Sequence, residues 1–201
     1  MGVLPSRILP TVDAQQLWRR VYDPGLMPKH QALMWKIHLK AAPHGLLLSH
    51  ILGHDSRCPR CGANNESIEH AYFSCPQIRP FWRRVEQTLT GSEASNRLDF
   101  TSAVDLSFRP RHGLTRATCL VPLAAAFWAI YRARIKQWKE QVGYNTDGLF
   151  AMWKHDITDI LAAKRRTAIK HDSYRRFRTR WTWIAGCVRL FLPHQAMSPS
   201  G

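Results

Sequence analysis

Apolar residues recur three and four positions apart through most of this chain, which is the spacing of amphipathic helices. The clearest stripe belongs to a helix that Pro76 opens and Gly91 ends. Its apolar members are Ile78, Trp82, Val85 and Leu89. The same pattern predicts helices over 14–22, 28–42, 44–52, 76–90, 122–141, 148–170 and 173–193. Since no segment alternates as a strand beyond two-residue ribbons near the cysteines, the predicted fold class is mostly α.

Capping residues support several of these boundaries. Asp13 can cap the first helix, Pro28 suits the first turn of the second, and Gly53 suits the end of the third. Thr146 or Asp147 can cap the helix over 148–170. Three apolar residues of the second helix are expected to share one face: Trp35, Leu39 and Ala42.

One group of residues has the spacing of a metal site. Its members, separated by two, eight and four residues, are Cys58, Cys61, His70 and Cys75. Two cysteines with two residues between them can turn both sulfurs toward one ion, and Gly62 allows the tight turn that follows. Four protein ligands leave no open coordination position. The sequence therefore predicts a structural Zn2+ site of CCHC type rather than a catalytic one.

The other cysteines and nearby histidines have simpler interpretations. Cys119 and Cys187 lie in apolar runs and are expected to be small core residues. His50 and His54 are alternative ligands, but both precede the cysteine pair. We expect a partly buried, hydrogen-bonded His50 and a surface His54. Cysteines clustered with a histidine indicate a metal in a reducing compartment rather than disulfides.

The composition between the helices suggests a division of the chain. Residues 92–114 mix Ser, Asn, Asp, Pro and Gly, which is typical of a linker or long loop. Residues 12–91 would then form a small zinc-pinned helical module, and residues 115–193 a region of long basic helices.

The net charge indicates which class of partner to expect. The chain has 29 Lys and Arg against 14 Asp and Glu, a net charge of +15. Residues 1–110 hold 13 basic and 9 acidic side chains (+4), whereas residues 111–201 hold 16 and 5 (+11). A positive field of this size favours a polyanion, and we expect nucleic acid, RNA or DNA, rather than a membrane.

The basic residues near the end of the chain are interleaved with aromatic ones. The predicted nucleic-acid contacts are Lys164, Arg165, Arg166, Lys170, Arg175, Arg176, Arg178 and Arg180. The aromatic residues among them are Trp153, Tyr174, Phe177, Trp181 and Trp183. Guanidinium groups pair with phosphates, and exposed aromatic rings stack on unpaired bases. The alternative interpretation is a solvated basic face over a core of aromatic residues, and 164–166 also fits a nuclear import signal.

Several short motifs occur together in the first half of the chain. They are Trp35-Lys36-Ile37-His38-Leu39, Cys58-Pro59-Arg60-Cys61-Gly62, Glu66-Ser67-Ile68-Glu69-His70, Phe73-Ser74-Cys75-Pro76 and Phe81-Trp82. With them, residues 15–90 resemble the zinc-binding domain that follows the reverse transcriptase in non-LTR retrotransposon polyproteins. The resemblance implies that the three cysteines and His70 bind zinc, and that the domain helps to hold element RNA or target DNA. Because the sequence carries no polymerase or endonuclease motif, we expect a detached C-terminal fragment of such an element.

The expected function is non-catalytic, zinc-dependent nucleic-acid binding. The alternatives are a zinc-stabilised protein–protein interaction domain and an inert retroelement relic. An enzyme is not expected, since the sequence has no Gly-rich phosphate loop and no Gly-x-Ser-x-Gly elbow. The start has no secretory pattern, and the longest uncharged run, 117–131, is too short to cross a bilayer. We therefore expect an intracellular protein, nuclear or cytoplasmic, whose oligomeric state the sequence does not indicate.

Overall fold

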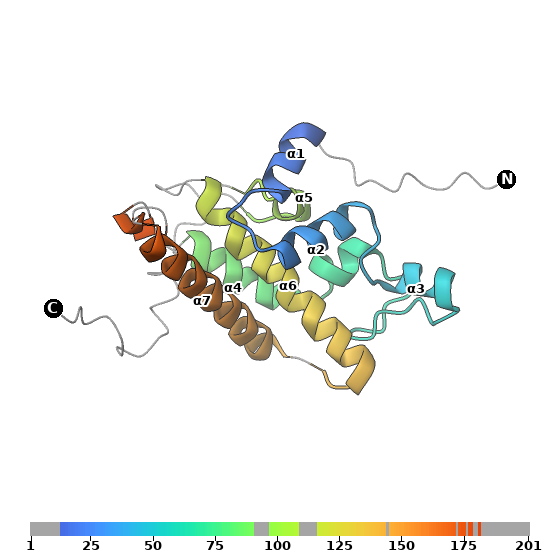
Figure 1. The fold of residues 1–201 in the computed structure, drawn as a ribbon. Helices are drawn as coiled ribbons and strands as arrows, with labels where there is room; N and C mark the ends of the chain where they lie inside the picture. The colour runs from blue at the N-terminus through green and yellow to red at the C-terminus, as the bar shows by residue number, and fades with distance from the viewer. Residues whose placement is uncertain are drawn as a thin grey trace.

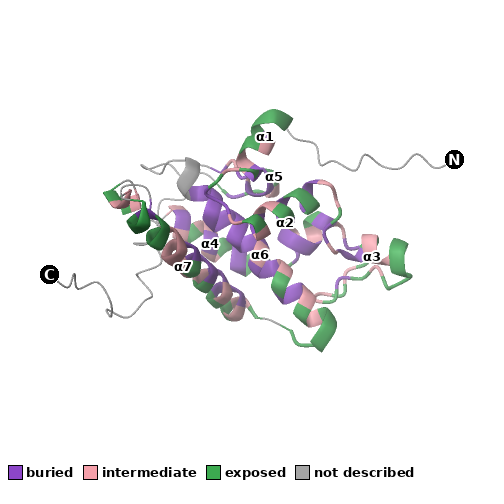
Figure 2. Ribbon diagram, in the orientation of Figure 1, coloured by how far each residue is buried: buried purple, intermediate pink, exposed green. Residues whose placement is uncertain are grey.

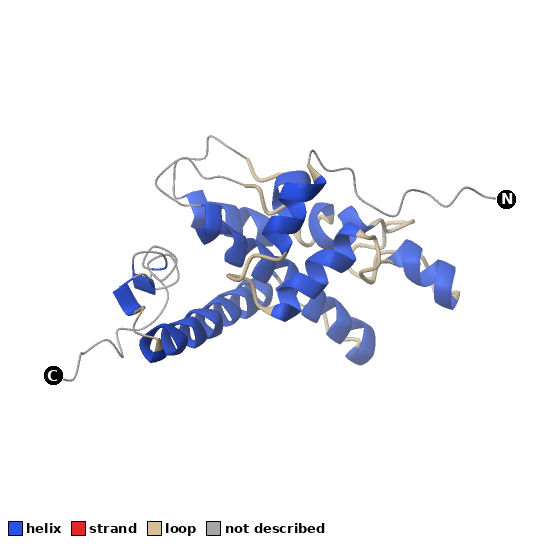
Figure 3. Ribbon diagram, turned by 45° about the horizontal axis from the view of Figure 1, so that its top comes forward, coloured by secondary structure: helices blue, strands red, loops and turns tan. Residues whose placement is uncertain are grey.

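The computed structural model describes residues 13–90, 97–108, 116–143, 145–171, 173–175, 177–178 and 181. The helices are α1 (Ala14–Val21), α2 (Pro28–His38), α3 (Gly45–Leu52), η1 (His70–Ser74), α4 (Arg79–Thr90), α5 (Phe100–Val104), α6 (Arg116–Glu140) and α7 (Thr146–Lys170) (Figure 1). Within these described ranges there is no strand (Figure 3). The predicted mostly α fold is thus confirmed.

The two longest helices, α6 and α7, lie side by side at the centre of the molecule (Figure 1). Helices α2 and α4 and the turn η1 pack against α6, and α4 also contacts α7. Buried residues gather where these helices meet, whereas α3 lies at one edge and is largely exposed (Figure 2). In the described part of the chain, no helix is both long and apolar enough to cross a membrane.

Aromatic contacts join the first and second halves of the chain. The ring of Trp82 on α4 lies 5.1 Å from the ring of Phe73 on η1 and 5.0 Å from the ring of Phe127 on α6, measured between centroids. All three side chains are buried. Pairs of this kind contribute about 0.5–1.5 kcal/mol beyond the burial of their area. The core around η1 and α4 is therefore completed by α6.

Several predicted boundaries are confirmed. The Asp13 side chain caps α1 by accepting a hydrogen bond from the backbone N–H of Gln16, at 3.1 Å. Gly53 ends α3 in the left-handed region, with φ of 66°. The stripe predicted for residues 76–90 is buried, although α4 itself begins at Arg79.

Helix α2 ends earlier than predicted and buries a different face. It ends at His38, and Lys40 follows with φ of 53°, so Ala42 is not helical. Trp35 is 42% exposed. The buried side chains are His30, Leu33, Met34, Ile37 and His38. Two histidines complete this face because the Nε2 atom of each finds a partner in the interior, which a count of apolar residues does not reveal.

Helix α6 begins before the predicted position, so Pro122 lies inside the helix instead of opening it. A proline inside a helix removes one backbone donor. The neighbouring helix contacts this turn directly: the indole N–H of Trp153 on α7 donates a hydrogen bond to the Pro122 carbonyl at 2.8 Å. Packing against α7 thus favours the turn around this proline.

The start of α7 is also set by a different residue. The Asn145 side chain caps this helix by accepting from the backbone N–H of Gly148 at 2.8 Å, where we expected Thr146 or Asp147. Asparagine is as good an N-cap as aspartate, so the helix begins at Thr146, two residues before the predicted start. The predicted last helix over 173–193 falls largely outside the described residues.

A short helix occupies part of the segment that we predicted as a linker or long loop. Asp99 and Ser102 form a capping box at the start of α5, with Ser102 N–H donating to Asp99 Oδ1 at 2.8 Å. Three apolar side chains in or after α5 are buried: Val104, Leu106 and Phe108. The polar residues of this segment therefore cap a packed helix. The remainder of 92–114 lies outside the described residues, and the division into domains stays a prediction.

A buried polar cluster joins α2 to α7. Asp156 of α7 is buried, and its carboxylate accepts hydrogen bonds from His30 Nε2, at 2.8 Å, and from Lys29 Nζ. Burial raises the pKa of the Asp156 carboxyl, but the hydrogen bonds from His30 and Lys29 outweigh this and hold the pKa below its ordinary value. The carboxylate is thus ionised and paired inside the core.

Loss of this carboxylate should destabilise the fold. Asp156→Ala leaves His30 and Lys29 without their buried partner, which should cost about 3–5 kcal/mol in the free energy of unfolding by urea. Asp159→Ala is the matched control, because Asp159 lies on the same helix and is 63% exposed in its contact with His155. It should change stability by less than about 0.5 kcal/mol. Equal effects of the two substitutions would contradict the role of the cluster.

Candidate metal centre

The first two cysteines lie on a tight turn between α3 and η1. The backbone N–H of Gly62 donates to the Cys58 carbonyl at 2.9 Å, and the N–H of Cys58 donates to the Ala63 carbonyl at 2.8 Å. Gly62 has φ of 75°, a left-handed conformation that glycine adopts without strain. The turn therefore aims the sulfurs of Cys58 and Cys61 to one side, as the motif predicts, and it does so without a strand among the described residues.

His70 and Cys75 are brought together by the π-helical turn η1. Its defining hydrogen bond runs from the N–H of Cys75 to the carbonyl of His70 at 3.1 Å, five residues apart. The wider π turn places the side chains at its two ends close together. The four residues between His70 and Cys75 therefore fit one π-helical turn. The sequence analysis did not predict this turn.

The four side chains converge on one point. One donor atom from each of Cys58, Cys61, His70 and Cys75 lies within 4.8 Å of all the others, and we call this group the Cys3His cluster. Two sulfurs that each lie about 2.3 Å from one tetrahedral ion are separated by about 3.8 Å. The Sγ atoms of Cys58 and Cys75 are 3.8 Å apart, and Cys61 Sγ lies 3.2 Å from His70 Nε2. The donor set and its dimensions fit zinc.

Burial and proximity shape the electrostatics of the cluster. Cys58 and Cys75 are buried, and Cys61 and His70 are half-buried. The hydrogen bond from Cys75 lowers the pKa of the Cys58 thiol well below that of a free cysteine, and the same bond raises the pKa of Cys75. Two thiolates this close are stable together only beside a cation, which is the charge arrangement of a cysteine-rich metal site.

Behind the cluster, a buried ion pair attaches the loop between α3 and η1, residues 53–69 and here called the metal loop, to α6. The Glu66 side chain is fully buried, and Arg134 donates to both of its oxygens, to Oε1 at 2.7 Å and also to Oε2. Glu66 Oε2 accepts a further hydrogen bond from the backbone N–H of Gly45, at 2.6 Å. One carboxylate thereby joins the start of α3, the metal loop and α6.

Two further contacts hold the cysteine turn against α6. The Arg60 guanidinium donates to the Ala71 carbonyl at 3.2 Å and to the Ile130 carbonyl at 3.4 Å. Gln137 Nε2 donates to the Pro59 carbonyl at 3.0 Å. Arg60 and Pro59 are the two residues between the cysteines, so the turn itself is anchored. Sequence spacing gives no signal for the two contacts with α6, because Ile130 and Gln137 lie 70 and 78 residues from their partners in the turn.

The histidines near the cluster differ in part from expectation. His50 is exposed on α3 rather than partly buried, because only Gly45 of that helix is buried. His54 is exposed, as predicted, and its ring meets the ring of Trp138 edge-on, with centroids 5.7 Å apart. Cys119 is buried, as predicted, and Cys187 lies outside the described residues.

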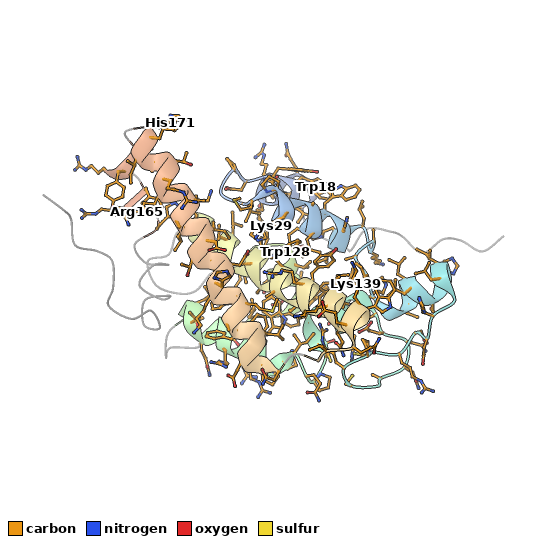
Figure 4. All side chains as sticks on the ribbon, turned by 60° about the horizontal axis from the view of Figure 1, so that its bottom comes forward. Trp18, Lys29, Trp128, Lys139, Arg165 and His171 are labelled. Carbon is orange, nitrogen blue, oxygen red and sulfur yellow. The ribbon has the colours of Figure 1, made fainter. Side chains whose placement is uncertain are left out.

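The predicted nucleic-acid contacts that the structure describes belong to the last turns of α7 and to residues that follow it, and Figure 4 shows Arg165 at this end of the helix. Arg165, Arg166, Lys170, Arg175 and Arg178 are exposed. Lys164 is half-buried and donates to the Pro24 carbonyl at 3.3 Å. Arg176 and Arg180 lie outside the described residues.

The aromatic residues among these basic ones divide into two groups. Trp153 and Trp181 are 1% and 5% exposed, so they are core residues and unable to stack on a base. Tyr174 and Phe177 are half-buried and stack on each other, with centroids 5.9 Å apart. Trp183 lies outside the described residues. The alternative interpretation, aromatic residues as core, is thus correct for Trp153 and Trp181.

The close packing around Glu66 yields a test. A Cβ at Gly45 would lie 2.2 Å from the Ser56 carbonyl oxygen and 2.9 Å from Glu66 Cβ, so Gly45→Ala must displace backbone of the metal loop. We expect a loss of about 3 kcal/mol or more in unfolding free energy, the upper end of overpacking effects. Gly143→Ala is the matched control, since a Cβ there meets nothing within 4 Å. It should be neutral or slightly stabilising, and urea unfolding that ranks the two variants equally would refute the packing argument.

Comparison with known proteins agrees with this geometry. Residues 7–82 match the family model described as zinc-binding in reverse transcriptase. The matched segment ends within α4 and contains every member of the Cys3His cluster. No curated protein and no solved structure matches the chain. Residues 7–82 are therefore similar to the zinc-binding domain that is associated with reverse transcriptases.

Proposed function

We propose that Cys58, Cys61, His70 and Cys75 bind one structural Zn2+ ion, and that the chain is a non-catalytic, zinc-dependent nucleic-acid-binding module. The observation that carries the proposal is the Cys3His cluster itself, four donors within 4.8 Å inside the segment that matches the family. Derivation from a non-LTR retrotransposon reverse transcriptase polyprotein is part of the same proposal, and the motifs of residues 15–90 support it.

The nucleic-acid part of the proposal is supported by charge. Residues 111–201 carry a net charge of +11, and α7 ends in a group of exposed cations that includes Arg165, Arg166 and Lys170. Exposed guanidinium and ammonium groups pair with phosphates and release condensed counterions, which makes binding favourable and dependent on salt. Lys164, Arg175, Arg176, Arg178 and Arg180 belong to the same proposed interface.

A second candidate function, protein binding, is favoured by α3. This helix exposes apolar side chains without any charged residue among them, namely Leu46 (41% exposed), Ile51 (63%) and Leu52 (54%). Exposed apolar surface of this kind is typical of a contact with another protein. The two candidates differ in salt dependence, because apolar contact is little affected by salt that screens phosphate pairing.

Two observations support a non-catalytic role. Four protein donors fill a tetrahedral zinc site and leave no position for a substrate. The His30–Asp156 pair has the composition of a catalytic dyad, but the His30 side chain is 0% exposed, so no substrate reaches it in this conformation. The pair instead joins α2 to α7.

The zinc proposal predicts one zinc per purified chain by elemental analysis. Structural zinc contributes on the order of 10 kcal/mol to small domains, so His70→Ala or treatment with a chelator should lower the melting temperature strongly. His50→Ala is the matched control, because His50 is an exposed histidine outside the cluster, and it should melt like the wild type. A preparation without zinc that melts normally would overturn the proposal.

The nucleic-acid proposal predicts that affinity falls steeply with salt. Arg165→Glu with Arg166→Glu should weaken binding to single-stranded RNA and to duplex DNA, and each lost phosphate contact should reduce the log–log salt slope by about 0.7–0.9. Arg19→Glu with Arg83→Glu removes the same charge from exposed sites on α1 and α4 and serves as control. Binding that ignores salt, or equal losses in both pairs, would count against the interface.

A further inference from the structure

One side of the second half of α6 is only partly covered by the rest of the protein. At 3.6 residues per turn, six of its residues fall within an arc of about 120°. These residues, here called the α6 strip, are Trp128, Tyr131, Arg132, Ile135, Trp138 and Lys139. All six are partly or fully exposed, whereas the buried residues of this half, such as Ala133 and Arg134, lie outside the arc. The strip contains two cations and no acidic residue.

Lys29 of α2 extends the strip at its first turn. Its ammonium lies 5.4 Å from the centre of the Trp128 ring, and the rings of Trp128 and Tyr131 are stacked, with centroids 5.3 Å apart and planes 28° apart. Figure 4 shows Lys29 beside Trp128, and Lys139 farther along the same helix. Trp128 is therefore held in place by its neighbours, and it supports the partly exposed Tyr131.

Trp138 continues the strip toward the metal loop. It is 43% exposed, and only the edge contact with His54 is described for its ring. It follows Tyr131 by seven residues, which is about 10 Å along the helix axis. Each of these two aromatic residues is followed by a cation, Arg132 and Lys139 respectively. Aromatic surface and positive charge thus alternate along one line.

We propose that the α6 strip is the surface on which this protein binds an unpaired nucleic-acid strand, with bases stacking on Tyr131 and Trp138 and phosphates pairing with Arg132 and Lys139. The proposal rests on the proposed nucleic-acid-binding function and assigns it a second, separate contact surface. Figure 4 shows Arg165, on α7, well away from Lys139, so the strip is distinct from the basic end of α7.

The chemistry of the strip selects a single strand. In a duplex the bases are stacked on each other and present only their edges, so an aromatic face on a convex helix gains nothing from them. In an unpaired strand each base offers a free face, and a ring beside a cation satisfies the base and its phosphate together. A protein partner would have to place acidic groups opposite both cations of the strip.

The test measures binding of the full chain to two fluorescent probes by anisotropy: a short oligouridylate and a mixed-sequence DNA duplex. Trp138→Leu should weaken oligouridylate binding about five- to 100-fold and leave duplex binding unchanged, and Trp138→Phe should retain most of the affinity. Trp35→Leu is the matched control, because Trp35 is 42% exposed on α2 and lies outside the strip. It should bind both probes like the wild type.

A second test changes the two cations of the strip, and it does not depend on whether a tryptophan variant folds. Arg132→Gln with Lys139→Gln should reduce the log–log salt slope for oligouridylate by about 1.4, the contribution of two phosphates on a single strand. Arg19→Gln with Arg83→Gln lowers the net charge equally from exposed sites elsewhere and should leave the slope near its wild-type value.

The outcomes separate this inference from the proposed function. If Trp138→Leu and the Arg132→Gln/Lys139→Gln pair bind oligouridylate as tightly as the wild type, the α6 strip is not the binding surface, and the proposed function remains intact. Equal loss of single-strand and duplex affinity in these variants also overturns the strip, since it indicates charge without stacking. If the wild type binds neither probe at low salt, the nucleic-acid function itself fails, and the strip with it.

Discussion

The bidentate pair between Arg134 and Glu66 is the contact on which the metal loop depends. Glu66 lies in the middle of that loop, and its backbone also bonds to both flanks, donating to the Ser56 carbonyl at 2.8 Å and accepting from the Leu46 N–H at 3.1 Å. Burial raises the pKa of the Glu66 carboxyl, while Arg134 opposes this rise by favouring the ionised form. An unpaired carboxylate at this position would be costly, so the loop holds its shape only where α6 presents the guanidinium.

The same logic extends from the metal loop to the whole molecule. Arg60, through the Ile130 carbonyl, and Pro59, through Gln137, attach the cysteine turn to α6. Asp156 attaches α7 to α2 through Lys29 and His30. Each contact joins residues that are far apart in the sequence and places a charge or a backbone carbonyl where only one partner satisfies it. Polar contacts of this kind add little net stability compared with apolar packing, but they penalise every other arrangement of the helices. Apolar burial drives the collapse of the chain. The buried polar pairs then select the arrangement of helices in which the four donors of the Cys3His cluster meet.

The sequence predicts the helices and the donor set well because both follow from local spacing. The stripe on α4, the caps at Asp13 and Gly53, and the turn at Gly62 each depend on residues within a few positions of one another. What it misses depends on distant partners. Histidines complete the buried face of α2 because His30 and His38 form hydrogen bonds with Asp156 and with the Val104 carbonyl, respectively. Helix α5 forms where composition indicates a loop because apolar residues in and after it are buried in the core. The sequence also does not show which aromatic residues of α6 are exposed, because spacing alone does not distinguish a buried stripe from one on the surface.

The segment that matches the zinc-binding family ends at residue 82, yet its fold requires residues beyond it. Without α6, Trp82 would lose its ring contact with Phe127, and the buried Glu66 carboxylate would lose the Arg134 guanidinium. Helix α6 thus belongs physically to the zinc-binding unit, although its sequence lies outside the match. The buried side of this helix carries Arg134, and its exposed side carries the α6 strip. Because a helix turns as a rigid body, the rotation of α6 that pairs Arg134 with Glu66 also fixes the direction in which Tyr131 and Trp138 face, so the geometry of the metal loop and of the exposed strip is set by one element.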